Sequence, residues 1–170
     1  VIEQKILAGY AGIDVYCHDK LFNQAVYEHS WNVVGIDTSF KATDKDEEFI
    51  FSQLKDNPDI KLIIATNYYW RLCPNNNTAL IRKLVAEGYN VVVVTNCPYE
   101  MGAVPEAKTV ICNYSASPES LRAAANVLFG KKEAKGKWPL KKYEMPTKSK
   151  PLDCGTGFVA EDNEVTEVTF

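Results

Sequence analysis

The sequence predicts one α/β domain of three layers, with a mostly parallel sheet between two layers of helices. Short apolar runs rich in Val and Ile recur along the chain, and they are nearly continuous, which is typical of strands covered on both faces. Segments with helical periodicity separate these runs, and this repeat gives right-handed βαβ units with helices on both sides of the sheet. The expected strands are Ile13–Cys17, Val33–Ile36, Ile60–Ala65, Val91–Val94 and Val110–Cys112.

Four helices are expected between and after these strands, and the last is the best defined. Ser117 is its predicted N-cap, Pro118 takes the first helical position, and Gly130 ends it. The asparagines 75–77 offer caps for the third helix, whereas Val1–Tyr10 fits either an extra helix or an upstream linker. The other three expected helices are Leu21–His29, Asp44–Lys55 and Thr78–Glu87. Together these elements predict a flavodoxin-like three-layer sandwich.

Composition sets limits on partners and compartment. The net charge of −3 gives no overall basic field for nucleic acid. No apolar run approaches the roughly 20 residues that cross a bilayer, so no membrane partner is expected. The five cysteines lack metal-ligand spacing, which predicts buried thiols, no metal site and a cytoplasmic more than a secreted location. Because the first residue is Val1, we expect a processed product or a piece of a longer protein.

The character of the chain changes after the last helix. Residues 131–150 hold eight lysines against two glutamates, and residues 151–170 hold five acids and no basic residue. This pattern fits a solvated connector with a surface extension, a polyanion site, or a segment that folds back on itself. Val165–Phe170 has the composition of a strand that adds to a sheet edge. We therefore expect an α/β domain over residues 1–143 and an extension or tail over 144–170.

The familiar cofactor sites of parallel sheets are not encoded. The glycines of Gly9-Tyr10-Ala11-Gly12 precede the expected first strand and lack dinucleotide-site spacing, and Gly136-Lys137 is followed by Trp138 where a P-loop needs Ser or Thr. The residues His18-Asp19-Lys20 replace the small hydroxyl residues of a flavin phosphate loop. Asn67 stands where a phospho-accepting receiver has an acid. No cofactor is therefore expected. A Cys17–His18 catalytic pair is also disfavoured, because neighbouring strand residues point to opposite faces.

Polar and aromatic residues gather where the third and fourth strands end. In an open parallel sheet, ligands bind beyond the carboxyl ends of the strands. Rings offer a large rigid area and amides fix orientation, so this set fits either a sugar-binding surface or a domain interface without a ligand. The candidate residues are Asn67, Tyr68, Tyr69, Trp70, Arg71, Asn96, Tyr99 and Glu100.

The chain from Ile60 to Leu140 resembles the C-terminal domain of family 3 glycoside hydrolases. The run Leu84–Glu100, a helix end followed by a Val-rich strand and an Asn-x-Pro-Tyr-acid turn, carries most of this resemblance. Gly136–Leu140 resembles the family's Gly-Lys-Leu-Pro-Val ending, with Trp138 in place of the usual Leu. The segments Pro105–Thr109, Asn113–Ser115 and Leu128–Gly130 continue it in order. The branch it resembles is that of the bacterial β-N-acetylhexosaminidases.

The resemblance implies a domain without catalytic residues. In that branch a separate N-terminal (β/α)8 barrel carries the aspartate nucleophile and a His–Asp acid/base pair, and the loop Asn67–Cys73 here has no carboxylate. The acids expected near strand ends, Asp19, Asp37 and Glu100, lie on different loops, whereas retaining hydrolysis needs two paired groups. The implied partners are this barrel and an N-acetylglucosamine-containing sugar at the cleft rim near Tyr68–Arg71. The alternative is a free-standing flavodoxin-like module that binds a ligand or a protein.

Overall fold

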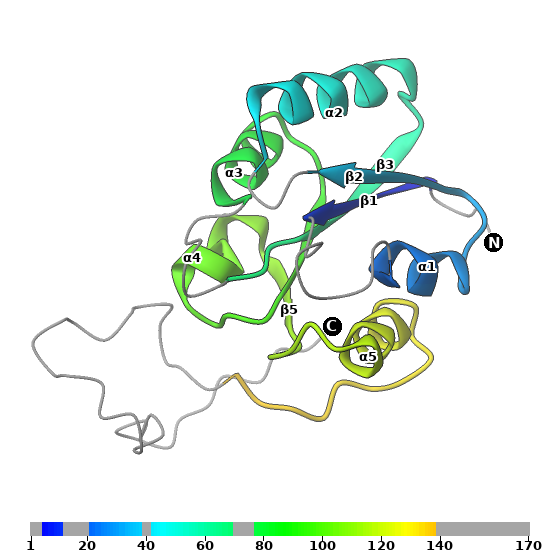
Figure 1. The fold of residues 1–170 in the computed structure, drawn as a ribbon, viewed down its shortest axis with the longest axis vertical. Coiled ribbons are helices and arrows are strands. Elements are labelled where there is room, and N and C mark those ends of the chain that lie inside the picture. Colours follow the sequence, from blue (N-terminus) through cyan, green and yellow to red (C-terminus); the bar gives the residue numbers. More distant parts are fainter. Residues whose placement is uncertain (1–4, 12–20, 39–41, 70–76, 139–170) are drawn as a thin grey trace, which may run out of the picture.

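The computed structural model describes residues 5–11, 21–38, 42–69 and 77–138, which form a sheet with helices on both faces (Figure 1). Strands and helices alternate along the chain as expected. Two short elements, α4 and the 3₁₀ turn η1, were not predicted, because each has fewer than five residues. The elements in order are β1 Lys5–Ala11, α1 Leu21–Tyr27, β2 Val33–Thr38, α2 Asp44–Asp56, β3 Ile60–Thr66, α3 Thr78–Ala86, β4 Val91–Thr95, α4 Glu100–Ala103, η1 Pro105–Ala107, β5 Thr109–Cys112 and α5 Pro118–Leu128.

The five strands form one parallel sheet in the order β2-β1-β3-β4-β5. This is the strand order of the flavodoxin-like fold, in which the winding direction reverses between β1 and β3. The predicted fold class is confirmed. The carboxyl ends of all the strands meet at one edge, which is where ligands bind in such sheets.

The opening segment was misinterpreted. Lys5–Ala11 forms the strand β1, although Val1–Tyr10 was interpreted as an extra helix or a linker. The predicted first strand, Ile13–Cys17, lies outside the described residues. β1 is hydrogen-bonded on both sides, with Ile6 paired to Val33 of β2 and to Leu62 of β3. Its six-residue run from Ile6 to Ala11 includes Gly9, and glycine in a strand weakens the signal on which the prediction relied. The first three residues of the Gly9–Gly12 motif therefore lie in β1. Gly12 lies outside the described residues, and the spacing of the motif does not match a dinucleotide site.

The core consists of two apolar layers, one on each face of the sheet. In β3, Ile63 and Ala65 point to the layer of α2, α3 and α4, while Ile64 points to the layer of α1 and α5. The same alternation holds in β4, where Val93 and Val94 face opposite layers and neither is exposed. Figure 1 shows α2, α3 and α4 on one side of the strands and α1 and α5 on the other. Both faces are covered, as the continuous apolar runs predicted.

Side chains cap the N-termini of α2 and α5, and the predicted N-cap Ser117 is confirmed. Thr43 and Asp46 form a capping box at α2, and Ser117 accepts a hydrogen bond from the backbone N–H of Ser120 at α5. At α3, Asn77 occupies the N-cap position as predicted, but its side chain makes no capping hydrogen bond and accepts from the backbone N–H of Ala42 at 3.0 Å instead. That side chain joins two loops, because a buried amide is satisfied equally well by a distant backbone group. Asn75 and Asn76 lie outside the described residues.

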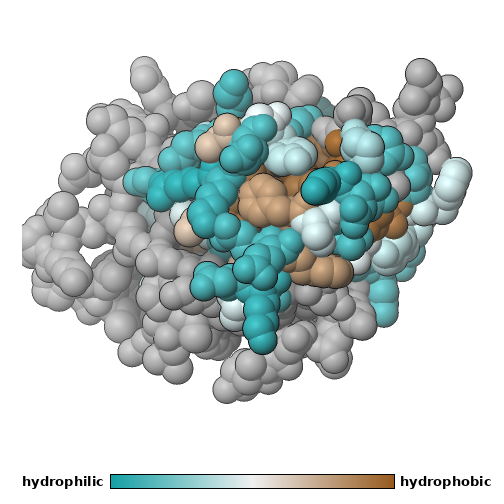
Figure 2. Space-filling view, turned by 90° about the horizontal axis from the view of Figure 1, so that it is seen from above, coloured by the Kyte–Doolittle hydropathy of each residue, from teal (hydrophilic) through white to brown (hydrophobic). Residues whose placement is uncertain are grey.

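The described surface is mostly polar. Figure 2, which views the molecule from the side of α2, shows hydrophilic side chains around a limited apolar area. Among the described residues, the exposed large apolar side chains come from three parts of the chain: Tyr27 and Trp31 at and just after the end of α1, Phe49 in α2, and Tyr114 after β5. Within the described ranges, no helix has the length and apolar character that crossing a membrane requires.

Candidate functional site

An asparagine directly follows each of the last three strands at the carboxyl edge of the sheet. Asn67 follows β3, Asn96 follows β4 and Asn113 follows β5. Sequence reasoning selected the first two and missed the third. Their side-chain contacts show which of them are available to a ligand.

Asn67 is a structural residue. It is 1% exposed, and its Nδ2 donates to Thr78 Oγ1 at 3.1 Å and to the carbonyl of Gly102 at 2.9 Å. Its Oδ1 accepts from the backbone N–H of Asn77 at 3.0 Å. The side chain therefore joins the end of β3 to the start of α3 and to α4, and its amide is satisfied inside the protein.

Tyr68 also belongs to the core. It is 2% exposed and lies in the apolar layer with α1 and α5, for example beside Phe22 and Leu121. Its hydroxyl accepts a hydrogen bond from Asn113 Nδ2 at 2.9 Å. Because the ring is buried in this layer, it supplies no rim surface in the described part of the chain.

Tyr69 and Asn96 are half-buried and bind each other through the backbone of Tyr69. The backbone N–H of Tyr69 donates to Asn96 Oδ1 at 2.8 Å, and Asn96 Nδ2 donates to the Tyr69 carbonyl at 3.1 Å. The carboxamide acts as a backbone group would and continues the pairing of β3 with β4. The next candidates, Trp70 and Arg71, lie outside the described residues.

Glu100, at the start of α4, is held by an arginine on α3. Its Oε1 accepts from Arg82 Nη2 at 2.7 Å, and Arg82 Nε donates to Glu106 Oε1 at 2.9 Å. The three side chains are 62%, 41% and 47% exposed in the order Glu100, Arg82, Glu106. The guanidinium therefore lies between two carboxylates on an open surface, where ion pairs contribute little to stability.

The two thiols at this edge have low reactivity. Burial raises the pKa of Cys97, which a hydrogen bond from the Tyr99 backbone partly offsets, and burial raises the pKa of Cys112 to about 11. Burial and the neighbouring Cys97 raise the pKa of Tyr99 as well. A thiol with a raised pKa carries little thiolate at neutral pH. His29 stacks on Phe129 with ring centroids 5.1 Å apart, where α1 and α5 end, and so lies away from these thiols.

The structure adds two residues that sequence reasoning missed. Thr95, the last residue of β4, is fully buried, and its hydroxyl donates to the Asn67 carbonyl at 2.7 Å and accepts from the backbone N–H of Cys97 at 3.0 Å. Gly102 in α4 packs so closely on Thr95 and Cys97 that an added Cβ would lie 2.5 Å from the Cys97 carbonyl oxygen. Neither has a local sequence signal, because both depend on segments that meet only in the folded chain.

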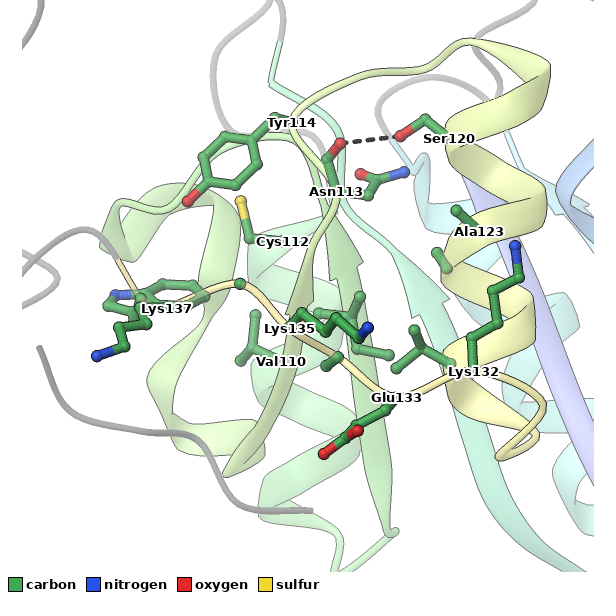
Figure 3. A pocket seen from close by; sticks show the side chains of 16 residues that line it. Val110, Cys112, Asn113, Tyr114, Ser120, Ala123, Lys132, Glu133, Lys135 and Lys137 are labelled. Carbon is green, nitrogen blue, oxygen red and sulfur yellow. Dashed lines mark hydrogen bonds between the residues drawn. The ribbon is translucent and has the colours of Figure 1, made fainter.

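A groove of about 350 Å³ runs along the outer edge of β5. β5 and α5 form its floor, and the segment from Lys132 to Trp138 forms the opposite wall (Figure 3). Asn113 lies at one end, and its buried Oδ1 has no hydrogen-bond partner among the residues that the structure describes. Among those same residues, no group of three or more His, Cys, Asp or Glu side chains is arranged to hold a metal ion.

Comparisons with known proteins agree with this geometry. Residues 43–165 match the model of the "Glycosyl hydrolase family 3 C-terminal domain". The fold is similar to the structure of a glycoside hydrolase family 3 beta-N-acetylglucosaminidase from Paenibacillus sp. str. FPU-7, with a TM-score of 0.66 and 20% sequence identity. That similarity covers 79% of this chain and 26% of the other chain, so this chain spans about a quarter of that protein. A search of curated protein sequences gives no significant match.

Proposed function

Since the chain belongs to the family 3 glycosyl hydrolase C-terminal domains, we propose that it is the non-catalytic C-terminal domain of a β-N-acetylhexosaminidase. In this proposal it packs against a separate (β/α)8 barrel that carries the catalytic residues, and it supports that barrel. The structural similarity to a β-N-acetylglucosaminidase of the same family supports the choice of substrate class.

The observation that carries the proposal concerns the carboxylates. Retaining glycoside hydrolysis needs a nucleophile and a proton donor on either side of one bond, about 5–5.5 Å apart when both are carboxylates. Within the described ranges, Glu100 at the start of α4 and Glu106 in η1 are joined by one side chain, because the Arg82 guanidinium bonds both carboxylates. Neither lines the groove along β5. In this arrangement one guanidinium bonds both carboxylates, so they do not flank an open space for a glycosidic bond.

The remaining polar groups at this edge support a scaffold role. Asn67 and Thr95 use their side chains to join β3, β4, α3 and α4. Tyr69, Asn96 and Tyr99 are half-buried, so part of each is available to a surface placed over the carboxyl edge. In our proposal the barrel, with an N-acetylglucosamine-containing sugar at its rim, covers these three residues.

The proposal is tested by hydrolysis of an aryl N-acetylglucosaminide. The purified 170-residue chain should release no aryl alcohol above the buffer rate, and a double variant with Glu100→Gln and Glu106→Gln should behave in the same way. The longer polypeptide encoded by the gene should contain the barrel and should hydrolyse the substrate. Turnover by the chain alone that is lost in the double variant would overturn the proposal. A gene that encodes no barrel would favour the free-standing binding module.

A further inference from the structure

The outer edge of β5 presents backbone groups that the described residues do not pair. The backbone N–H of Asn113 donates to the Thr95 carbonyl of β4, and backbone directions alternate along a strand. The N–H and C=O groups of Val110 and Cys112 therefore point away from β4. Both residues line the groove, so these groups face its interior.

The opposite edge of the sheet shows how such groups are covered elsewhere in this chain. At β2, the outward N–H of Gly35 donates to the hydroxyl of Tyr27 at 3.1 Å. An uncovered strand edge is a template for pairing with another extended segment, and proteins usually cover it or place charges beside it. At β5 no described side chain forms a hydrogen bond to the outward backbone groups as Tyr27 does at β2, and a groove lies along this edge.

The charges around this groove indicate what kind of segment fits. Lys132, Lys135 and Lys137 line it, against one acid, Glu133 (Figure 3). The floor between them is apolar, with side chains such as Ala123 and Val127 of α5. A strand with an apolar face and acidic neighbours would pair with the edge of β5 and would neutralise the lysines.

We propose that the groove along β5 binds the acidic end of this same chain, residues 151–170, through backbone pairing with Val110 and Cys112. This segment has five acids and no basic residue, and it ends in the strand-like sequence Val165–Phe170. Trp138, the last described residue, itself lines the groove, so the chain continues from that place. The twelve residues 139–150 can span up to about 40 Å, which is enough for the acidic segment to return to the groove.

Amide hydrogen exchange on the full chain, followed by NMR, tests this inference. The amides of Val110 and Cys112 should exchange at least about tenfold more slowly in the wild-type chain than in a variant whose tail acids are replaced by amides. The amide of Ile111 points to β4 and should exchange at the same rate in both, which shows that the sheet remains folded. The variant carries Asp153→Asn, Glu161→Gln, Asp162→Asn, Glu164→Gln and Glu167→Gln.

A matched pair of lysine variants provides the second arm. Lys132→Glu with Lys135→Glu should speed exchange at Val110 and Cys112, whereas Lys45→Glu with Lys55→Glu on α2 should leave it unchanged. A salt concentration of 1 M, at which the screening length is roughly 3 Å, should also speed exchange at Val110 and Cys112, as the Lys132→Glu, Lys135→Glu variant does. Equal exchange in the wild-type chain and the tail variant would overturn the proposal. Protection that rises with protein concentration would also overturn it, because a second copy would then fill the groove.

Discussion

Replacing Gly102 by alanine tests the packing at the carboxyl edge. A Cβ at this position would lie 2.5 Å from the Cys97 carbonyl oxygen, 2.6 Å from Cys97 Cβ and 2.8 Å from Thr95 Oγ1. Two of these three atoms are backbone or directly attached to it, and the third is fixed by its hydrogen bond to the Asn67 carbonyl. None can move away by a simple side-chain rotation, so α4 must shift as a whole.

The size of the effect follows from two opposing terms. Added atoms in a well-packed region cost about 1–3 kcal/mol. Alanine is favoured over glycine inside a helix by up to about 1 kcal/mol. Because α4 has four residues, we expect less than the full helix gain. The net expectation for Gly102→Ala is a loss of about 1–2 kcal/mol in the free energy of unfolding.

Urea unfolding of the full chain measures this change, and Gly136→Ala is the matched control. An added Cβ at Gly136 has no atom within 4 Å, so this variant should be as stable as the wild-type chain or slightly more stable. If Gly102→Ala is as stable as the wild-type chain, helix propensity outweighs packing and the close contact of α4 with β4 is refuted.

Two further predictions concern residues at the same edge. Asn67→Ala should lower the free energy of unfolding, measured by urea denaturation, by about 2–4 kcal/mol, because it leaves buried backbone groups without partners. Asn96 is half-buried, so Asn96→Ala should lower it by about 1 kcal/mol. Similar losses in the two variants would contradict the structural role of Asn67. Alkylation of Cys112, mapped by mass spectrometry, should have its midpoint near pH 11 in the folded chain and near pH 8.5 in the unfolded chain. Since the folded-state pKa is the higher one, the stability that the neutral thiol contributes is complete below about pH 8.5 and is lost as pH rises through about 11. A midpoint near 8.5 in the folded chain would show that the thiol is not buried.

The sequence predicted where the candidate residues lie in the chain but not the direction in which their side chains point. Asn67 and Tyr68 were selected because they follow a strand, and that placement is confirmed. Their side chains nevertheless point into the protein, because Gly102 and Asn113, which are distant in sequence, supply their partners. A pattern of polar residues at strand ends predicts the backbone position of each residue, whereas the orientation of its side chain depends on partners from distant segments.

The sequence by itself determined the class of fold. Continuous apolar strands separated by helices bury both faces of their sheet in a three-layer sandwich. The apolar runs of β2 to β5 are clear enough for these strands to be predicted from the local sequence. The tertiary structure alone decided that Lys5–Ala11 is a central strand, because its evidence is pairing with β2 and β3. It also decided that the edge of β5 faces a groove, since an open edge is a property of the whole sheet and of the segment beside it.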